Sequence, residues 1–309
     1  MVMSRLLFAA NGDIFIGQSN INGESKELVY NNYGSKNSEL TWRLDDVKLL
    51  NIQTNAQVYN KIILGFNFSK NMTVYKSIMD DYDWINNAQW TDWSNHPDTT
   101  VKKVLRYDLY LKYKLEEIEV ELFDFYLQSG YRYDQLQWEA KGGRYIYSRN
   151  GGFRNYIGNF PSDNIGISYG QDYTSVYMKL DAVYSKQNFI IKNSILYSPS
   201  VVARDHDLHH NRGLYEKTNG YGKEQKGLYF EGIFDTGQLF EYKLDISYSI
   251  ATHLDLTAYY FLTYYDIGKG YNKVTDVDTQ DLRYTPLDSA AISHKSSTTG
   301  FAIKYIFDV

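Results

Sequence analysis

Two short acidic segments contain residues whose types and spacing could hydrolyse a bond. The first segment contains Asp81 and Asp83. The second contains Asp205, Asp207 and His209. Within each segment these residues are two positions apart, so on an extended strand they point to the same side. The spacing predicts two small groups of titratable side chains, each facing one side of a strand.

His209 is the candidate general base, and Asp207 would orient its imidazole and raise its basicity. Asp81 and Asp83, at a separation of about 5 Å, would repel each other by a few kcal/mol at an effective dielectric of ~20, which favours a shared proton or water. No Gly-x-Ser-x-Gly elbow occurs in the chain, which disfavours a serine nucleophile. The pattern therefore predicts hydrolysis by an activated water without a covalent intermediate.

Both segments also have simpler interpretations. Paired carboxylates in loops often bind calcium weakly or only contact water. His206, His209 and His210 could ligate zinc together with Asp205 or Asp207. On a regular strand, however, His206 and His210 would point away from His209, so a zinc site would need an irregular loop. We therefore expect neither a metal nor another cofactor at the site.

The composition excludes several classes of protein. The chain has 309 residues, a formal net charge of -5, no Cys and 31 Tyr. Without Cys there is no disulfide scaffold, no thiolate metal site and no cysteine nucleophile. The acidic balance argues against a nucleic-acid partner, because phosphates require a basic surface. The length allows a single large β-domain.

Alternating apolar and polar residues are the main structural signal. In residues 240–250, Phe240, Ile246 and Tyr248 share one face with other apolar residues, while Glu241 and Asp245 share the opposite face with other polar ones. Only a strand has this period of two. The pattern recurs in residues 107–115, 176–184, 254–262 and 301–307. Tight polar turns at 186–188 and 251–253 alternate with long loops rich in Gly, Asn, Asp and Ser.

This pattern predicts an all-β antiparallel transmembrane barrel with long extracellular loops. Outer-membrane barrels have short turns on one side of the membrane and long loops on the other, and only alternate residues of each strand face lipid. A strand together with half of a connection takes about 25–35 residues, so the chain length predicts about 8–12 strands, with ten as the central value. A soluble β-sandwich is the alternative, but it does not explain strands that end in Tyr and Trp, which suit a membrane interface.

The chain resembles the omptin family, the outer-membrane proteases of Gram-negative bacteria. The resemblance spans nearly the whole chain, although beyond about residue 215 it rests on the strand pattern. Its most specific part is the segment Asp205-x-Asp207-x-His209. The other matching segments follow in the family order and are residues 23–30, 79–84, 90–99, 142–148, 152–154 and 157–161.

The resemblance implies a ten-stranded barrel that projects beyond the membrane and carries an extracellular cleft. In this cleft the pair Asp81 and Asp83 would face the pair Asp207 and His209. A water activated between His209 and Asp81 would attack the peptide carbonyl, so the enzyme would be an aspartic-type endopeptidase that uses neither metal nor covalent nucleophile.

The resemblance also assigns residues to substrate binding. Glu27 and Asp205 match acids that line the pocket for the residue before the scissile bond, which implies Arg or Lys there. Asp92 matches a further acid that favours a basic residue on the leaving side. Ser94 and His96 lie near the cleft in the same comparison, and we expect them to support the site rather than to perform chemistry.

Members of this family need lipopolysaccharide for activity and bind it on the outer barrel wall. Tyr131 matches one of the binding positions. At other positions this chain has Tyr133, Gln135 and Asp172, where the compared members have an acid and two arginines. The resemblance thus implies lipopolysaccharide as an activator, with a dependence that is altered here or met by other residues.

These observations together predict a single barrel domain over residues 1–309, located in the bacterial outer membrane with its active site facing the cell exterior. We expect a monomeric endopeptidase that cleaves polypeptides at or between basic residues. The alternative is a barrel that acts mainly as an adhesin or host-protein binding surface, with weak or lost proteolysis. A zinc-dependent hydrolase is the third possibility, and a chelator would distinguish it.

Overall fold

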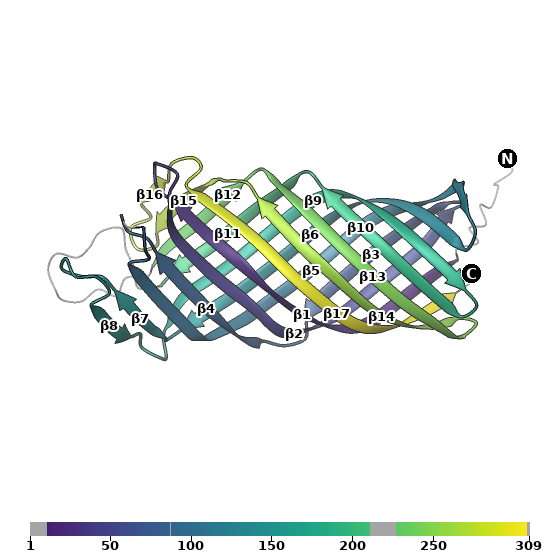
Figure 1. The fold of residues 1–309 in the computed structure, drawn as a ribbon, viewed down its shortest axis with the longest axis horizontal. Helices are drawn as coiled ribbons and strands as arrows, with labels where there is room; N and C mark the ends of the chain where they lie inside the picture. The colour runs from purple at the N-terminus through teal and green to yellow at the C-terminus, as the bar shows by residue number, and fades with distance from the viewer. Residues whose placement is uncertain (1–10, 87, 211–226, 308–309) are drawn as a thin grey trace, which may run out of the picture.

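The strands form one closed sheet. The computed structural model describes residues 11–86, 88–210 and 227–307. In these ranges every regular element is a strand, and all strands belong to one sheet. The sheet closes because β1 (Gly12–Tyr30) pairs antiparallel with both β2 (Lys36–Tyr59) and β17 (Ala290–Phe307). Figure 1 shows the resulting barrel. The described ranges contain no helix that could cross a membrane.

Ten antiparallel strands make up the ring, as predicted from the chain length. Four of them are divided into two segments by a short break. After β2 the ring is made of β3 (Ile62–Asn71) with β4 (Tyr75–Asp83), β5 (Asp92–Val120), β6 (Phe123–Lys141), β9 (Ile165–Lys186), β10 (Phe189–Ser198) with β11 (Val201–His209), β12 (Leu228–Phe234) with β13 (Gly237–Ala251), and β14 (Leu254–Ile267) with β15 (Tyr271–Asp276).

The two ends of the barrel differ in their connections. At one end each hairpin turn has two residues, at 60–61, 121–122, 187–188 and 252–253. Two of these are the turns predicted from sequence. At the other end the connections are longer, and they contain the short strands β7 (Arg144–Tyr147), β8 (Tyr156–Asn159) and β16 (Leu282–Tyr284). Figure 1 shows these three strands clustered at one end of the barrel. The predicted asymmetry is confirmed.

The apolar faces predicted from the period of two lie on the outer surface. Leu109, Val176, Ile246, Leu256 and Ile303 represent five strands of this outer belt, and each is 45–61% exposed. An exposed band of this kind is unfavourable in water and favourable in lipid, because only lipid provides an apolar solvent for it. The outer belt therefore marks the membrane-spanning part of the barrel.

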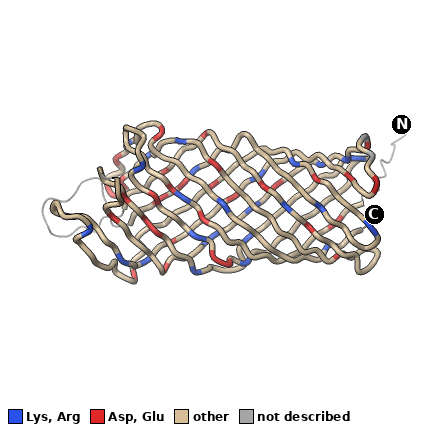
Figure 2. Tube along the Cα trace, in the orientation of Figure 1, with Lys and Arg blue, Asp and Glu red and all other residues tan. Residues whose placement is uncertain are grey.

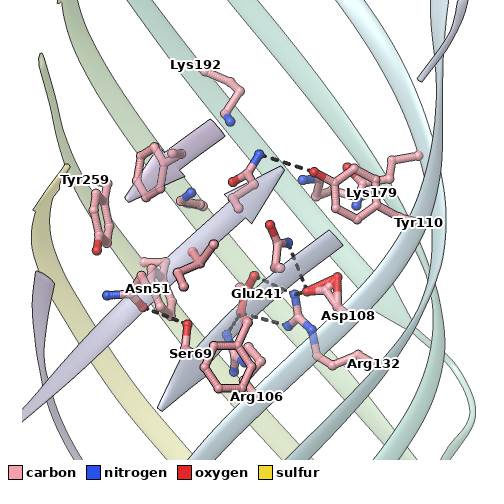
Figure 3. Close-up of a pocket in the computed structure, with 18 residues that line it drawn as sticks. Asn51, Ser69, Arg106, Asp108, Tyr110, Arg132, Lys179, Lys192, Glu241 and Tyr259 are labelled. Carbon is pink, nitrogen blue, oxygen red and sulfur yellow. Dashed lines mark hydrogen bonds and ion pairs between the residues drawn. The ribbon is translucent and has the colours of Figure 1, made fainter. Parts of the chain in front are cut away.

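The opposite face of the same strands fills the barrel with paired charges. Arg132 lies within 2.9 Å of Glu241 and 3.2 Å of Asp108, and Arg106 lies within 2.6 Å of Asp134 and 2.9 Å of Glu241. Arg106, Asp108, Arg132 and Glu241 line a cavity of about 80 Å³, shown in Figure 3. Figure 2 shows acidic and basic residues interspersed along the barrel. We call these ion pairs the lumen network.

Toward the end with long loops, aromatic side chains replace the lumen network. On β6 the inward residues change from Arg132 and Asp134 to Leu136, Trp138 and Ala140, all of which are buried. Trp138 joins a stack of rings in which the centroids of Trp42 and Tyr169 lie 4.9 Å apart and those of Trp42 and Trp138 lie 6.0 Å apart. Ring stacking and burial of these large surfaces stabilise a rigid layer across the barrel. We call this layer the aromatic floor.

Candidate active site

The first wall of the site is the end of β4. Met79 is fully buried in the aromatic floor. The period of two then places Asp81 and Asp83 on the same inward face, one and two steps farther toward the loops. Asp81 lies opposite Leu40 of β2 and Ser94 of β5, and the hydroxyl of Ser38 donates a hydrogen bond of 3.4 Å to its Oδ1. Asp83 ends the strand opposite Asp92.

The second wall is the end of β11, where Asp205, Asp207 and His209 are buried on one face. His209 Nε2 lies 2.6 Å from Asp207 Oδ2. A proton on Nε2 satisfies this contact and leaves Nδ1 as the nitrogen that can accept a proton. Phe230 of β12 contacts the imidazole edge-on, with ring centroids 5.5 Å apart. The imidazole is therefore held from two sides.

The two walls face each other across one cavity of about 410 Å³. Asp81 and His209 both line this cavity, although they are far apart in sequence and on strands that do not pair. Ser94 and His96 line it beside Asp81, with Ser94 Oγ 3.3 Å from His96 Nε2. The cavity is large enough for water and part of a peptide.

Glu27 and Asp205 form a second acidic group next to this cavity. Both are almost fully buried. Gly232 donates its backbone N–H to Asp205 Oδ1 at 2.8 Å, and the Tyr169 hydroxyl lies 3.4 Å from Oδ2. In the part of the chain that the structure describes, neither carboxylate has a Lys or Arg partner.

Burial and the charge of Asp207 favour protons on these two acids. Both acids lie outside the membrane-spanning part of the barrel. At their level the outward residues of β11 change from the apolar Val202 to the polar Arg204 and His206. Burial, followed by the charge of Asp207, raises the pKa of Asp205 to about 7. Burial, followed by the charges of Asp207, Asp205 and Asp81, raises the pKa of Glu27 well above its usual value. A cation placed between the two carboxylates would reverse both shifts.

Asp92 lies on the other side of Asp81 from Glu27. Its carboxylate is buried and accepts a hydrogen bond of 2.7 Å from the backbone N–H of Ser148, while Arg149 Nη1 lies 3.0 Å from its other oxygen. Asp92 is not among the residues that line the cavity. The structure thus places this predicted binding residue near the site but in an ion pair with Arg149.

The three histidines of the second segment point to different partners. His206 faces outward, where its ring nitrogens lie 2.6 Å from the Tyr229 hydroxyl and 3.2 Å from Asp172 Oδ2. His210 follows the end of β11, lies 2.9 Å from Ser168 Oγ and reaches the rim of the cavity. In the described ranges, no cluster of three or more His, Cys, Asp or Glu side chains has the arrangement of a metal site.

The outer wall carries the residues compared with a lipopolysaccharide site. Tyr131 is 44% exposed. The Tyr133 hydroxyl donates a hydrogen bond of 3.1 Å to Asp172, which also contacts His206. The carboxylate of Asp172 therefore has two partners from neighbouring strands. Whether this wall binds lipopolysaccharide stays a prediction.

Three further residues at or beside the site received no role from the sequence. Tyr147 and Phe160, from the β7 and β8 region, line the cavity with Asp81, and the rings of His96 and Phe160 stack at 5.0 Å. Arg149 is the third, whereas His210 was considered only as a possible zinc ligand. Tyr147 and Phe160 lie within the matching segments 142–148 and 157–161, which was the available signal. Arg149 lies between the matching segments, so no pattern indicated it.

Comparisons with known proteins place the chain in a family. A model of the omptin family matches residues 11–307. The chain belongs to the omptin family of outer-membrane proteases. It is 30% identical over 292 residues to the plasminogen activator of Yersinia pestis, covering 93% of this chain and 86% of that protein. It is 28% identical over 305 residues to the outer membrane protease IcsP of Shigella flexneri, covering 96% and 89%.

Solved structures agree with the fold of an omptin. The outer membrane protease OmpT from Escherichia coli superposes with a TM-score of 0.86 at 24% identity, covering 96% of this chain and 97% of that chain. The likeness shows the same barrel architecture. The chain is therefore an outer-membrane β-barrel of the omptin family, and the outer belt is its membrane-facing surface.

Proposed function

We propose that this omptin is an endopeptidase that hydrolyses peptide bonds next to basic residues with an activated water. The observation that carries the proposal is the cavity in which Asp81 and His209 face each other, with His209 bound to Asp207 at 2.6 Å. A base held by a carboxylate, opposite a second pair of carboxylates, is an arrangement that can hold and deprotonate one water molecule. The relative named as an outer membrane protease, from Shigella flexneri, supports the same reaction class.

In this proposal His209 takes a proton from the water as the water oxygen bonds to the carbonyl carbon. The carbonyl π electrons move to the carbonyl oxygen, and the imidazolium is stabilised by Asp207. Collapse of the tetrahedral intermediate breaks the C–N bond, and the imidazolium returns the proton to the leaving amine. Asp81 accepts the second hydrogen bond of the water and orients it, and Asp83 is the next carboxylate on the same face of β4. No covalent bond to the protein forms.

The residue before the scissile bond would be Arg or Lys. Glu27 and Asp205 are buried acids beside the cavity, and both have raised pKa values because of burial and the charge of Asp207. A guanidinium or ammonium group between them would pair with both carboxylates and replace the protons that they otherwise retain. A neutral side chain would leave two buried acids without a partner, so charge discriminates against it.

Lipopolysaccharide is proposed as an activator that binds the outer wall. Tyr131 is exposed there, whereas Asp172 contacts Tyr133 and His206. A carboxylate at this position repels a phosphate, so we expect a weaker dependence on lipopolysaccharide or binding through other residues.

The test is cleavage of quenched-fluorescent peptides containing Arg-Arg, Arg-Lys or Arg-Ala by detergent-refolded protein, with and without rough lipopolysaccharide. The matched controls are His209→Ala and His253→Ala, the latter in a turn at the opposite end of the barrel. We expect cleavage by the wild type and by His253→Ala, and none by His209→Ala. Absence of cleavage by a folded wild type under both conditions would contradict the proposal and favour an adhesin or host-protein binding surface.

A further inference from the structure

The ion pair between Asp92 and Arg149 distinguishes the two sides of the cavity. Asp92 is 4% exposed, and both of its carboxylate oxygens are engaged, one by the Ser148 N–H and the other by Arg149. Glu27 and Asp205, on the other side, have no cationic partner among the described residues. A basic substrate side chain would therefore meet two unneutralised acids on one side and an acid already neutralised on the other.

Arg149 is held in place by its own loop. Its backbone N–H donates to Asn155 Oδ1 at 2.9 Å, Asn155 Nδ2 donates to its carbonyl at 3.1 Å, and Nη1 also donates to the Ser148 carbonyl at 2.8 Å. Asn150 and Gly151, with φ values of 53° and 77°, make the tight turn that follows. These contacts hold both the backbone and the guanidinium of Arg149, so the ion pair does not depend on one flexible side chain alone.

The guanidinium also contacts a residue that lines the cavity. It packs over the ring of Tyr147, with 4.5 Å between Arg149 Cζ and the ring centroid. Tyr147 lines the cavity together with Asp81 and His209. The Arg149 side chain remains 45% exposed, which leaves N–H donors accessible to a bound peptide.

Strand order decides which side of the scissile bond reaches Arg149. Glu27 on β1 lies opposite Leu40 on β2, Leu40 lies opposite Asp81 on β4, and Asp81 lies opposite Ser94 on β5. Asp81 thus lies between Glu27 and the β5 wall that carries Asp92. A peptide whose basic residue points to Glu27 and whose carbonyl lies at Asp81 continues toward β5, Tyr147 and Arg149.

We propose that Arg149 determines selectivity on the leaving side, by neutralising Asp92 and presenting a cation to the residue after the scissile bond. This inference rests on the proposed function. The favoured residue at that position is neutral or acidic, because a Lys or Arg would approach a guanidinium instead of a free carboxylate. The substrate class is therefore a junction between a basic residue and a neutral or acidic one. This role differs from the preference for a basic leaving-side residue that the family resemblance implies for Asp92.

The experiment measures kcat/KM for three peptides that differ only after the scissile Arg, with Lys, Ala or Asp at that position. The enzymes are the wild type, Arg149→Gln and Arg149→Lys. Lys114→Gln serves as a control, because it removes a cation from the partly exposed Lys114–Asp124 pair at the opposite end of the barrel. All proteins are first shown to be folded by heat-modifiable gel migration.

We expect the wild type and Lys114→Gln to cleave Arg-Ala and Arg-Asp faster than Arg-Lys. Arg149→Gln should raise the Arg-Lys rate relative to Arg-Asp by roughly fivefold to tenfold, the scale of one partly exposed charge pair. Arg149→Lys, which keeps the charge, should retain most of the wild-type ratio.

Two outcomes separate this inference from the proposed function. If the folded wild type cleaves none of the peptides, the proposed function and this inference both fail. If it cleaves them but prefers Arg-Lys, and Arg149→Gln leaves the ratio unchanged, only the role of Arg149 is overturned. If Arg149→Gln does not fold, the test uses the wild type and Arg149→Lys. A wild-type preference for Arg-Lys over Arg-Asp would overturn the role of Arg149, and a preference for Arg-Asp that Arg149→Lys retains would support it.

Discussion

The lumen network and the acids of the active-site cleft, Glu27, Asp205 and Asp207, are two polar regions inside the same barrel. Their buried charges are balanced in different ways. In the lumen network, Glu241 and Asp108 contact Arg132, and Asp134 contacts Arg106. In the cleft, Glu27, Asp205 and Asp207 lie close enough to raise the pKa values of the first two. Each of these lumen acids has an arginine partner, whereas neither Glu27 nor Asp205 has a Lys or Arg partner among the residues that the structure describes.

The pair of Asp92 and Arg149 shows that position alone does not decide which behaviour an acid has. Asp92 lies opposite Asp83 near the cleft, yet it is paired with an arginine as the lumen acids are. One cation from a loop is enough to pair a buried acid at this end of the barrel. The contrast therefore predicts that substitutions in the lumen network affect mainly stability, and that those in the cleft affect mainly catalysis and selectivity.

The largest effect is expected from removal of the cleft base or its opposing acid. His209→Ala or Asp81→Asn should reduce kcat by at least about 10³-fold, because the water loses the base or the group that orients it. The barrel should remain folded, since neither side chain belongs to the aromatic floor. Single-turnover cleavage of an Arg-Arg peptide checks this. Asp80→Asn is the control, because Asp80 is the outward neighbour of Asp81, and this variant should keep a near-wild-type kcat. A loss of kcat in Asp80→Asn as large as that in Asp81→Asn would overturn the catalytic role assigned to Asp81.

In the lumen network, Glu241→Gln should destabilise the barrel by about 3–5 kcal/mol, because it leaves Arg106 and Arg132 buried with less compensating charge. Cleavage per folded molecule should be unchanged. Denaturant unfolding in detergent measures the loss. The reference is Glu231→Gln, which breaks a more exposed pair with Lys273 and should cost at most about 1 kcal/mol. Equal losses in both variants would remove the distinction between the two regions.

Asp205→Asn should stabilise the folded barrel in a pH-dependent way. The pKa of Asp205 is raised from 3.8 to about 7 by burial and by Asp207. Between these values the folded state holds a proton that the unfolded state has lost, so stability falls as the pH rises from about 4 to about 7. The variant should gain on the order of 1–3 kcal/mol at pH 8 and little at pH 4. Unfolding at both pH values tests this, with Asp124→Asn as the exposed control. A gain that is independent of pH would contradict it.

The smallest effect is expected for selectivity. Glu27→Gln should reduce the preference for Arg over a neutral residue before the scissile bond by about tenfold, because one of the two acids that face the basic side chain is lost. The comparison of kcat/KM for matched Arg and Gln peptides measures it. Glu24→Gln is the control. Glu24 lies on the same strand and pairs with Lys295 on the outer surface, so its replacement should leave the preference unchanged. An unchanged preference in Glu27→Gln would remove this residue from the pocket.

Much of the barrel follows from local pattern. The period of two in residues such as Leu109, Val176 and Ile246 predicts which side of each strand meets lipid, and the structure confirms it. Two-residue turns and long loops follow from composition in the same way. The breaks that divide four strands were not predicted, because a break depends on the register with both neighbouring strands, and single-strand patterns carry no register.

The site was predictable only in part. Spacing places Asp205, Asp207 and His209 on one face, and the structure shows the contact between Asp207 and His209. The same reasoning could not pair Asp92 with Arg149 or bring Tyr147 to the cavity. Those contacts depend on how the loop after β7 folds back on β5, and local sequence does not encode that path.

The sequence by itself therefore determined the strand periodicity and the two acidic segments, since these depend on neighbours along the chain, and the chain length limited the number of strands to about 8–12. Only the tertiary structure decided which acids are paired with cations and which are not. An ion pair requires two side chains to meet within about 4 Å, and in a barrel that distance is set by closure and register between strands far apart in sequence.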